Sequence, residues 1–238
     1  MDDHELRDRI RRLCAEGAST NGIARTLGVP RGKIAPLVRA LAREQSEAAP
    51  EPAVLGCWVS SGWSLGLGVD ADRDWRDRPE DGIEGSGLAA VLVAREARGG
   101  GASVCGYLVD TYCLGVKDAL GPRVMSRAAL RRFAGEFFAP FAGGGVEAPI
   151  GLARHLVWGA VAFARDLGFE PHRDLRAAAG HLGGRLDEPC GIRFGRNGRP
   201  YYMQGPFDDA PRILRTLERT VGRDNFHFTV SAEAFETV

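Results

Sequence analysis

The chain has 238 residues, 44% hydrophobic and 26% charged, which is ordinary for a globular protein with one substantial core and a small additional module. Its 31 basic and 31 acidic residues give a formal net charge of zero. This balance excludes a polycation that coats nucleic acid along its whole length, so any DNA contact must come from a local basic patch.

Three helices are predicted at the N-terminus, over Glu5–Ala15, over Thr20–Leu27 and from Arg31 onward. Ser19 or Thr20 can cap the second helix, and Gly28 suits the left-handed position that closes it. The inward-facing apolar positions are Leu6, Ile10 and Leu13 in the first helix and Ile34, Leu37, Val38 and Leu41 in the third.

The second and third helices carry a specific pattern. Ala24 is small enough to let two helices approach, and Gly28 makes the turn between them. The packing positions around them are Ile23, Leu27, Val29, Ile34 and Leu37. This pattern resembles the helix-turn-helix segments of bacterial repressors and recombinases. The resemblance covers about residues 1–45 and implies that the third helix contacts DNA.

Positive charge is concentrated in the same segment. Residues 17–43 contain no acid, and their basic residues are Arg25, Arg31, Lys33, Arg39 and Arg43. These five are the predicted DNA contacts, because phosphate binding needs such a patch. Pro36 departs from the pattern, since it removes an amide donor and predicts either a kink or a late helix start. The alternative is a three-helix module that docks onto another protein.

Residues 46–52 are polar, proline-ended and without an apolar period, so they are predicted to link a module over 1–45 to a domain over 53–238. The larger domain should begin with strands at Val54–Val59 and Trp63–Val69. Residues 70–84 are rich in acids, but interleaved arginines favour a solvated loop over a divalent metal site.

The remaining elements predict an α+β fold. Leu88–Ala97 and Ala102–Tyr112 should form a central antiparallel hairpin. Helices are expected at Ser126–Phe138, Ala148–Gly168, Pro171–Leu182 and Asp208–Val221. Arg196–Arg199, with its Asn-Gly pair, should join two strands between Cys190 and Gln204, and Phe226–Val230 should be a closing strand. We expect an antiparallel sheet with helices on one face.

Candidate chemical residues follow the central strand. Asp110 lies at its end, Cys113, Lys117 and Asp118 come next, and Lys117 is the expected partner of Asp110. They could be a general acid/base pair beside a thiol, or a satisfied turn that closes the strand. His155, on the apolar helix, could reach this region as a base or be hydrogen-bonded inside the core.

Other polar groups give weaker signals. Arg196 and Arg199 at the hairpin tip could bind phosphate or a partner's carboxylates, or could simply be solvated. The histidines at 172, 181 and 227 show no metal-ligand spacing with each other or with Cys190, so no metal site and no cofactor are predicted.

Gly106–Asp118 reads Gly-Tyr-Leu-Val-Asp-Thr-Tyr-Cys-Leu-Gly-Val-Lys-Asp. With the preceding apolar strand, this motif resembles a recurrent bacterial family, over about residues 53–238. The resemblance implies no activity, so it assigns no residue a role.

Five cysteines without a C-x-x-C pair, and an acidic N-terminus without an apolar leader, favour a reducing cytoplasm. Charged residues interrupt the longest apolar helix candidate, so no membrane partner is expected.

The leading hypothesis is a DNA-binding regulator, with double-stranded DNA as partner and a larger domain that forms a homodimer or senses a small-molecule or protein ligand. The alternative is an enzyme, a hydrolase or nuclease, with its site around Asp110, Cys113, Lys117 and His155.

Overall fold

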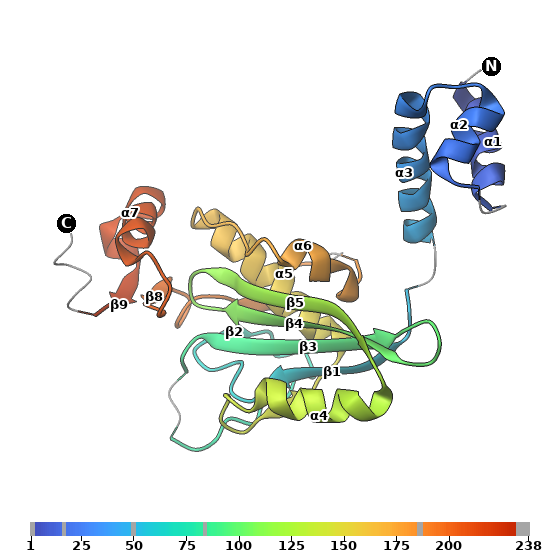
Figure 1. Cartoon of the computed structure of the whole chain (residues 1–238). Coiled ribbons are helices and arrows are strands. Elements are labelled where there is room, and N and C mark those ends of the chain that lie inside the picture. Colours follow the sequence, from blue (N-terminus) through green and yellow to red (C-terminus); the bar gives the residue numbers. More distant parts are fainter. Residues whose placement is uncertain (1–2, 16–17, 49–50, 83–84, 185–187, 232–238) are drawn as a thin grey trace. The chain divides into compact units, whose positions relative to one another are not determined.

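A computed structural model describes residues 3–15, 18–48, 51–82, 85–184 and 188–231, and the side chains within these ranges except those of 3, 4, 15 and 42–48. Contacts divide the chain into two compact units, residues 1–51 and residues 52–238. Each unit is described by itself below (Figure 1).

Unit 1 consists of α1 (Asp3–Ala15), α2 (Thr20–Leu27) and α3 (Arg31–Ala48), so the three predicted helices are confirmed. Its core consists of Ile10, Ile23, Ile34 and Leu41, at 0 to 3% exposure. The Ser19 hydroxyl accepts a hydrogen bond from the amide of Gly22 at 3.1 Å, and Gly28 closes α2 with a φ of 63°.

Helix α3 begins at Arg31, as predicted, and continues through Pro36, so the alternative of a late start is excluded. It also continues to Ala48, three residues into the segment that the sequence predicts as a linker. Pro36 is exposed, so the carbonyl group of Gly32, which loses its helical donor there, can be solvated.

Unit 2 is built on a five-stranded antiparallel sheet in the order β5-β4-β3-β1-β6. The strands are β1 (Val54–Ser60), β3 (Leu88–Glu96), β4 (Ala102–Asp110), β5 (Gly115–Met125) and β6 (Gly145–Glu147). Strands β3 and β4 pair along their whole length, from Leu88↔Asp110 to Glu96↔Ala102. The predicted central hairpin is therefore confirmed, while β5 was not predicted.

The helices of unit 2 are α4 (Arg127–Phe138), α5 (Ile150–Asp166), α6 (Leu175–Ala178) and α7 (Ala210–Thr220), with short 3-10 turns η1 (Ala179–His181) and η2 (Arg223–Asn225). The helix predicted over 171–182 is reduced to α6 and η1. None of the described helices is long and apolar enough to cross a membrane.

Helices cover both faces of the sheet, and the prediction of one covered face is wrong (Figure 1). Val91 and Tyr107 belong to the core beneath α5 and α6, whereas Leu92 and Val104 belong to the core beneath α4. The physical reason lies in β3, whose residues 89–95 are all buried. A strand buried at every position needs cover on both sides.

The C-terminal segment forms a small layer of its own. Strands β8 (Tyr201–Met203) and β9 (His227–Thr229) are parallel and are connected through α7. Strand β7 (Ile192–Arg193) pairs with β2 (Gly68–Val69) and not with β8, its predicted hairpin partner. Strand β2 is shorter than the strand predicted at 63–69. The predicted hairpin is therefore wrong.

The turn of that hairpin does form, because Asn197 and Gly198 have φ values of 55° and 79° and Arg196 bridges Arg199. Its two strands diverge immediately afterwards and pair with different partners. The Asn-Gly pair therefore predicts the local turn correctly and says nothing about longer pairing.

Candidate functional site

Asp110 closes β4 by binding the backbone of the following turn. Its Oδ1 accepts hydrogen bonds from the amides of Tyr112 and Cys113, each at 2.9 Å. The carboxyl group is only 6% exposed, and this burial raises its pKa to about 6, although the backbone donors and the charge of Lys117 oppose the shift.

Cys113 is a core residue of the turn. It has no exposed surface and packs in one apolar cluster with Leu167, Tyr202 and Leu217. Burial raises the pKa of its thiol strongly, and the neighbouring Asp110 carboxylate adds to the effect. A thiol held in its neutral form is a poor nucleophile, so this environment favours packing over chemistry.

Lys117 does not form its predicted pair with Asp110. Its Nζ lies 2.8 Å from both carboxylate oxygens of Asp208, at the approach to α7. Asp208 also accepts a hydrogen bond from the amide of Gly205 at 2.8 Å. A Cβ atom on residue 205 would lie 2.9 Å from the Lys117 ammonium and 3.0 Å from Asp208, so glycine there lets the backbone approach the pair.

The Lys117–Asp208 pair lies in a cleft of about 510 Å³ between β5, the connection that follows α5, and the first turns of α7. The charged or titratable residues that line it are Lys117, Glu170, His172, Asp208, Asp209 and Arg212. Phe207 also lines it and is 99% exposed. The cleft therefore combines an exposed aromatic ring with side chains of both signs of charge.

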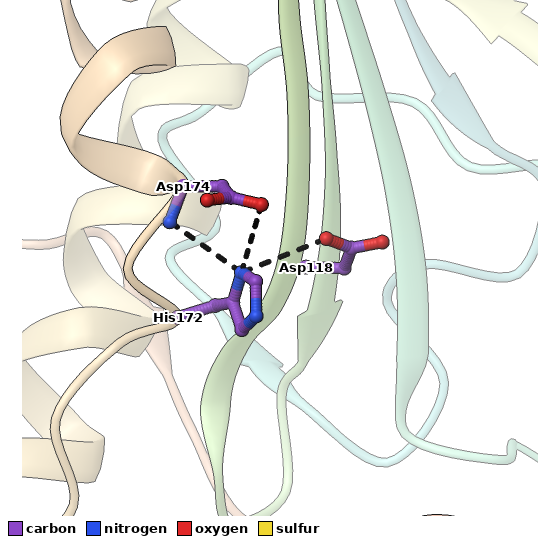
Figure 2. A group of neighbouring side chains, drawn as sticks. All are labelled: Asp118, His172 and Asp174. Atoms are coloured by element: carbon purple, nitrogen blue, oxygen red, sulfur yellow. Dashed lines mark hydrogen bonds and ion pairs between the residues drawn. The ribbon is translucent and has the colours of Figure 1, made fainter.

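Asp118 joins a second polar group, shown in Figure 2. His172 Nδ1 lies 3.6 Å from Oδ1 of Asp118 and 3.7 Å from Oδ2 of Asp174. The amide of Asp174 lies 3.5 Å from the same nitrogen. His172 also lines the cleft, so this group forms part of the cleft's rim.

His155 is buried, at 2% exposure, and its polar contacts are with a different segment from those of Asp110. Nδ1 accepts a hydrogen bond from the amide of Gly191 at 3.0 Å, and Nε2 lies 3.1 Å from Glu188. Trp75 packs against its ring at 4.8 Å. These bonds fit the core-histidine alternative.

The side chains of unit 1 form a basic exposed face. Between residues 32 and 39 the exposed positions of α3 are Gly32, Lys33, Pro36 and Arg39. This spacing of three to four residues places them along one stripe of the helix. Arg25 and Arg31 are also exposed, whereas the side chain of Arg43 lies outside the described residues.

The Asn-Gly turn carries a smaller basic surface. Arg196 lies over the Tyr201 ring, 5.1 Å from its centroid, and Arg199 Nη1 lies 3.1 Å from His227 Nε2. Both arginines therefore have aromatic or imidazole neighbours within the chain, and with these neighbours they line a cleft of about 500 Å³.

Comparison with family models, with curated proteins and with solved structures gave no match. The function must therefore be argued from the geometry alone.

Proposed function

We propose that this chain is a DNA-binding regulator in which unit 1 contacts duplex DNA through the exposed stripe of α3. The observation that carries the proposal is the stripe itself, where Lys33 and Arg39 are exposed one helical turn either side of Pro36. No acid occurs between residues 17 and 43 to oppose phosphate binding. The left-handed turn at Gly28, between α2 and α3, also suits such a module.

The proposed role of unit 2 is to sense a ligand in the cleft at the Lys117–Asp208 pair. The cleft combines a fully exposed aromatic ring with several charged side chains, which is a chemistry suited to a small polar ligand. Catalysis receives less support, because Cys113 is a buried thiol and His155 is bonded to the loop at 188–191.

The test is titration of a fluorescently labelled mixed-sequence duplex with the full chain, followed by anisotropy at several salt concentrations. We expect saturable binding at low salt that weakens steeply as salt rises, because phosphate contacts release counterions. A chain that fails to bind duplex DNA even at low salt would contradict the proposal and favour a protein-docking module.

A further inference from the structure

The group formed by Asp118, His172 and Asp174 comes from two segments that the fold brings together. Asp118 lies on the edge strand β5, and the two other residues lie in the connection between α5 and α6. The amide of His172 donates a hydrogen bond to the carbonyl oxygen of Val116 at 2.9 Å. This bond fixes the connection against the strand and holds the imidazole opposite Asp118 (Figure 2).

The distances within this group do not fit direct hydrogen bonds. Nitrogen–oxygen hydrogen bonds are roughly 2.7–3.2 Å long, whereas His172 Nδ1 lies 3.6 and 3.7 Å from the two carboxylate oxygens. Two ligand atoms that are each about 2.1 Å from one ion, and about 3.6 Å from each other, subtend about 120° at that ion. The three ligand atoms lie within 4.8 Å of one another, so small side-chain rotations suffice to complete the set.

The charges of the group also suit a cation. Carboxylate oxygens of Asp118 and Asp174 both face His172 Nδ1, and the amide of Asp174 lies 3.5 Å from the same nitrogen. Arg173 Nε lies 3.7 Å from the other oxygen of Asp174, but its side chain is 90% exposed and offsets this charge only in part.

We propose that Asp118, His172 and Asp174 form a binding site for one divalent transition-metal ion of the zinc or manganese class. An imidazole nitrogen with two carboxylate oxygens suits these ions better than calcium or magnesium, which prefer oxygen alone. The side chains are 64%, 37% and 54% exposed in chain order, so the remaining coordination positions are open to water or to a ligand.

The location of the site gives it a role in the cleft. His172 lines the cleft together with Lys117 and Arg212. The cleft also carries the acids Glu170, Asp208 and Asp209, so an ion at its rim would offset part of their negative charge. The ligand class that we infer is a small anion whose carboxylate or phosphate oxygens fill the open coordination positions of the ion.

The experiment is calorimetric titration of the metal-free full chain with zinc and with manganese ions. The wild-type chain should bind one ion saturably. His172→Ala, Asp118→Asn and Asp174→Asn should each weaken binding about tenfold or more. The matched controls are His227→Ala and Asp224→Asn, which alter exposed residues of the same types elsewhere in unit 2 and should leave the affinity unchanged.

Cobalt replaces zinc in a second measurement, because its absorption spectrum distinguishes nitrogen and oxygen ligands from thiolates. A spectrum without a thiolate charge-transfer band is expected, and this spectrum should be lost in His172→Ala. Three results would each overturn the site: absence of saturable binding of both ions, unchanged binding in His172→Ala with its circular dichroism intact, or a thiolate band from partly exposed Cys14 or Cys190.

Discussion

The Lys117 ammonium lies 2.8 Å from both carboxylate oxygens of Asp208, which is 91 residues further along the chain. The pair joins the edge strand β5 to the approach to α7, and thus ties the C-terminal layer to the main sheet. Its side chains are 21% and 11% exposed, so it is desolvated more than a surface ion pair.

Breaking this pair from either side should destabilise the protein. Lys117→Met and Asp208→Asn should each lose about 2–3 kcal/mol of unfolding free energy, less than the ~3–5 kcal/mol of fully buried pairs because water reaches both groups. The double variant should recover at least half of the summed loss, because it leaves neither charge without its partner.

Urea unfolding of the wild type, the two single variants and the double variant measures this coupling. Arg132→Met is the matched control, because the side chains of Arg132 and its partner Glu136 are 85% and 60% exposed. It should change stability by less than about 0.5 kcal/mol. A double variant that loses the full sum of the singles would show that the two residues act independently.

Asp110 should make stability fall as pH rises. Burial raises its folded pKa to about 6, above the ordinary value of 3.8, so the folded state binds the proton more tightly than the unfolded state. The stability that the protonated form contributes is therefore present below about pH 4 and is lost progressively up to about pH 6.

The Asp110→Asn variant has no carboxyl group to titrate at this position. Its side-chain amide oxygen can still accept the two backbone hydrogen bonds. Relative to wild type, the variant should gain about 3 kcal/mol between about pH 4 and pH 7, measured by chemical unfolding across that range. Asp224→Asn, at an exposed position, controls for the loss of one carboxylate. A variant that is less stable than wild type at pH 7, with no pH-dependent gain, would contradict this account of Asp110.

The local elements of the fold were predictable, whereas their pairing was not. Caps and apolar periods correctly placed α2, α4 and the β3–β4 hairpin. Strand β5 was missed because Lys117, Asp118 and a Gly121–Pro122 step interrupt its apolar pattern. It is nevertheless stable as an edge strand, where proline and charged side chains are tolerated.

The candidate site was predictable only in part. The sequence identified Lys117 and Asp118 as polar residues beside an apolar strand, but it paired Lys117 with Asp110 at the end of that strand. Asp208 and His172 reach the cleft through long-range packing, and their spacing along the chain carries no signal of it. Asp208 and Asp209 both had a sequence cue, as caps of the helix predicted over Asp208–Val221, and Asp209 is the cap of α7.

Pro36 should limit the stability of unit 1. Pro36→Ala restores an amide donor to the carbonyl group of Gly32 and should stabilise this unit by about 1–3 kcal/mol, measured by hydrogen exchange of the α3 amides. Gly32→Ala is a matched control in the same helix, since a Cβ atom there meets nothing within 4 Å. It should stabilise by only about 0.5–1 kcal/mol.

The DNA affinity of Pro36→Ala shows whether this proline only limits the stability of the helix or also shapes its contact surface. If α3 contacts DNA as the continuous helix observed here, Pro36→Ala should bind at least as tightly as wild type. A gain in stability accompanied by a large loss of affinity would show instead that the proline itself shapes the contact surface.

The salt dependence of DNA binding tests the central claim most directly. The full chain, Lys33→Ala/Arg39→Ala and the control Arg7→Ala/Arg12→Ala, which removes two exposed charges from α1, are titrated with the same duplex. If the α3 stripe contacts phosphates, the slope of log affinity against log salt should flatten by about 2 in the first variant and stay unchanged in the control. Equal affinity and equal slope in all three proteins would contradict DNA contact through α3.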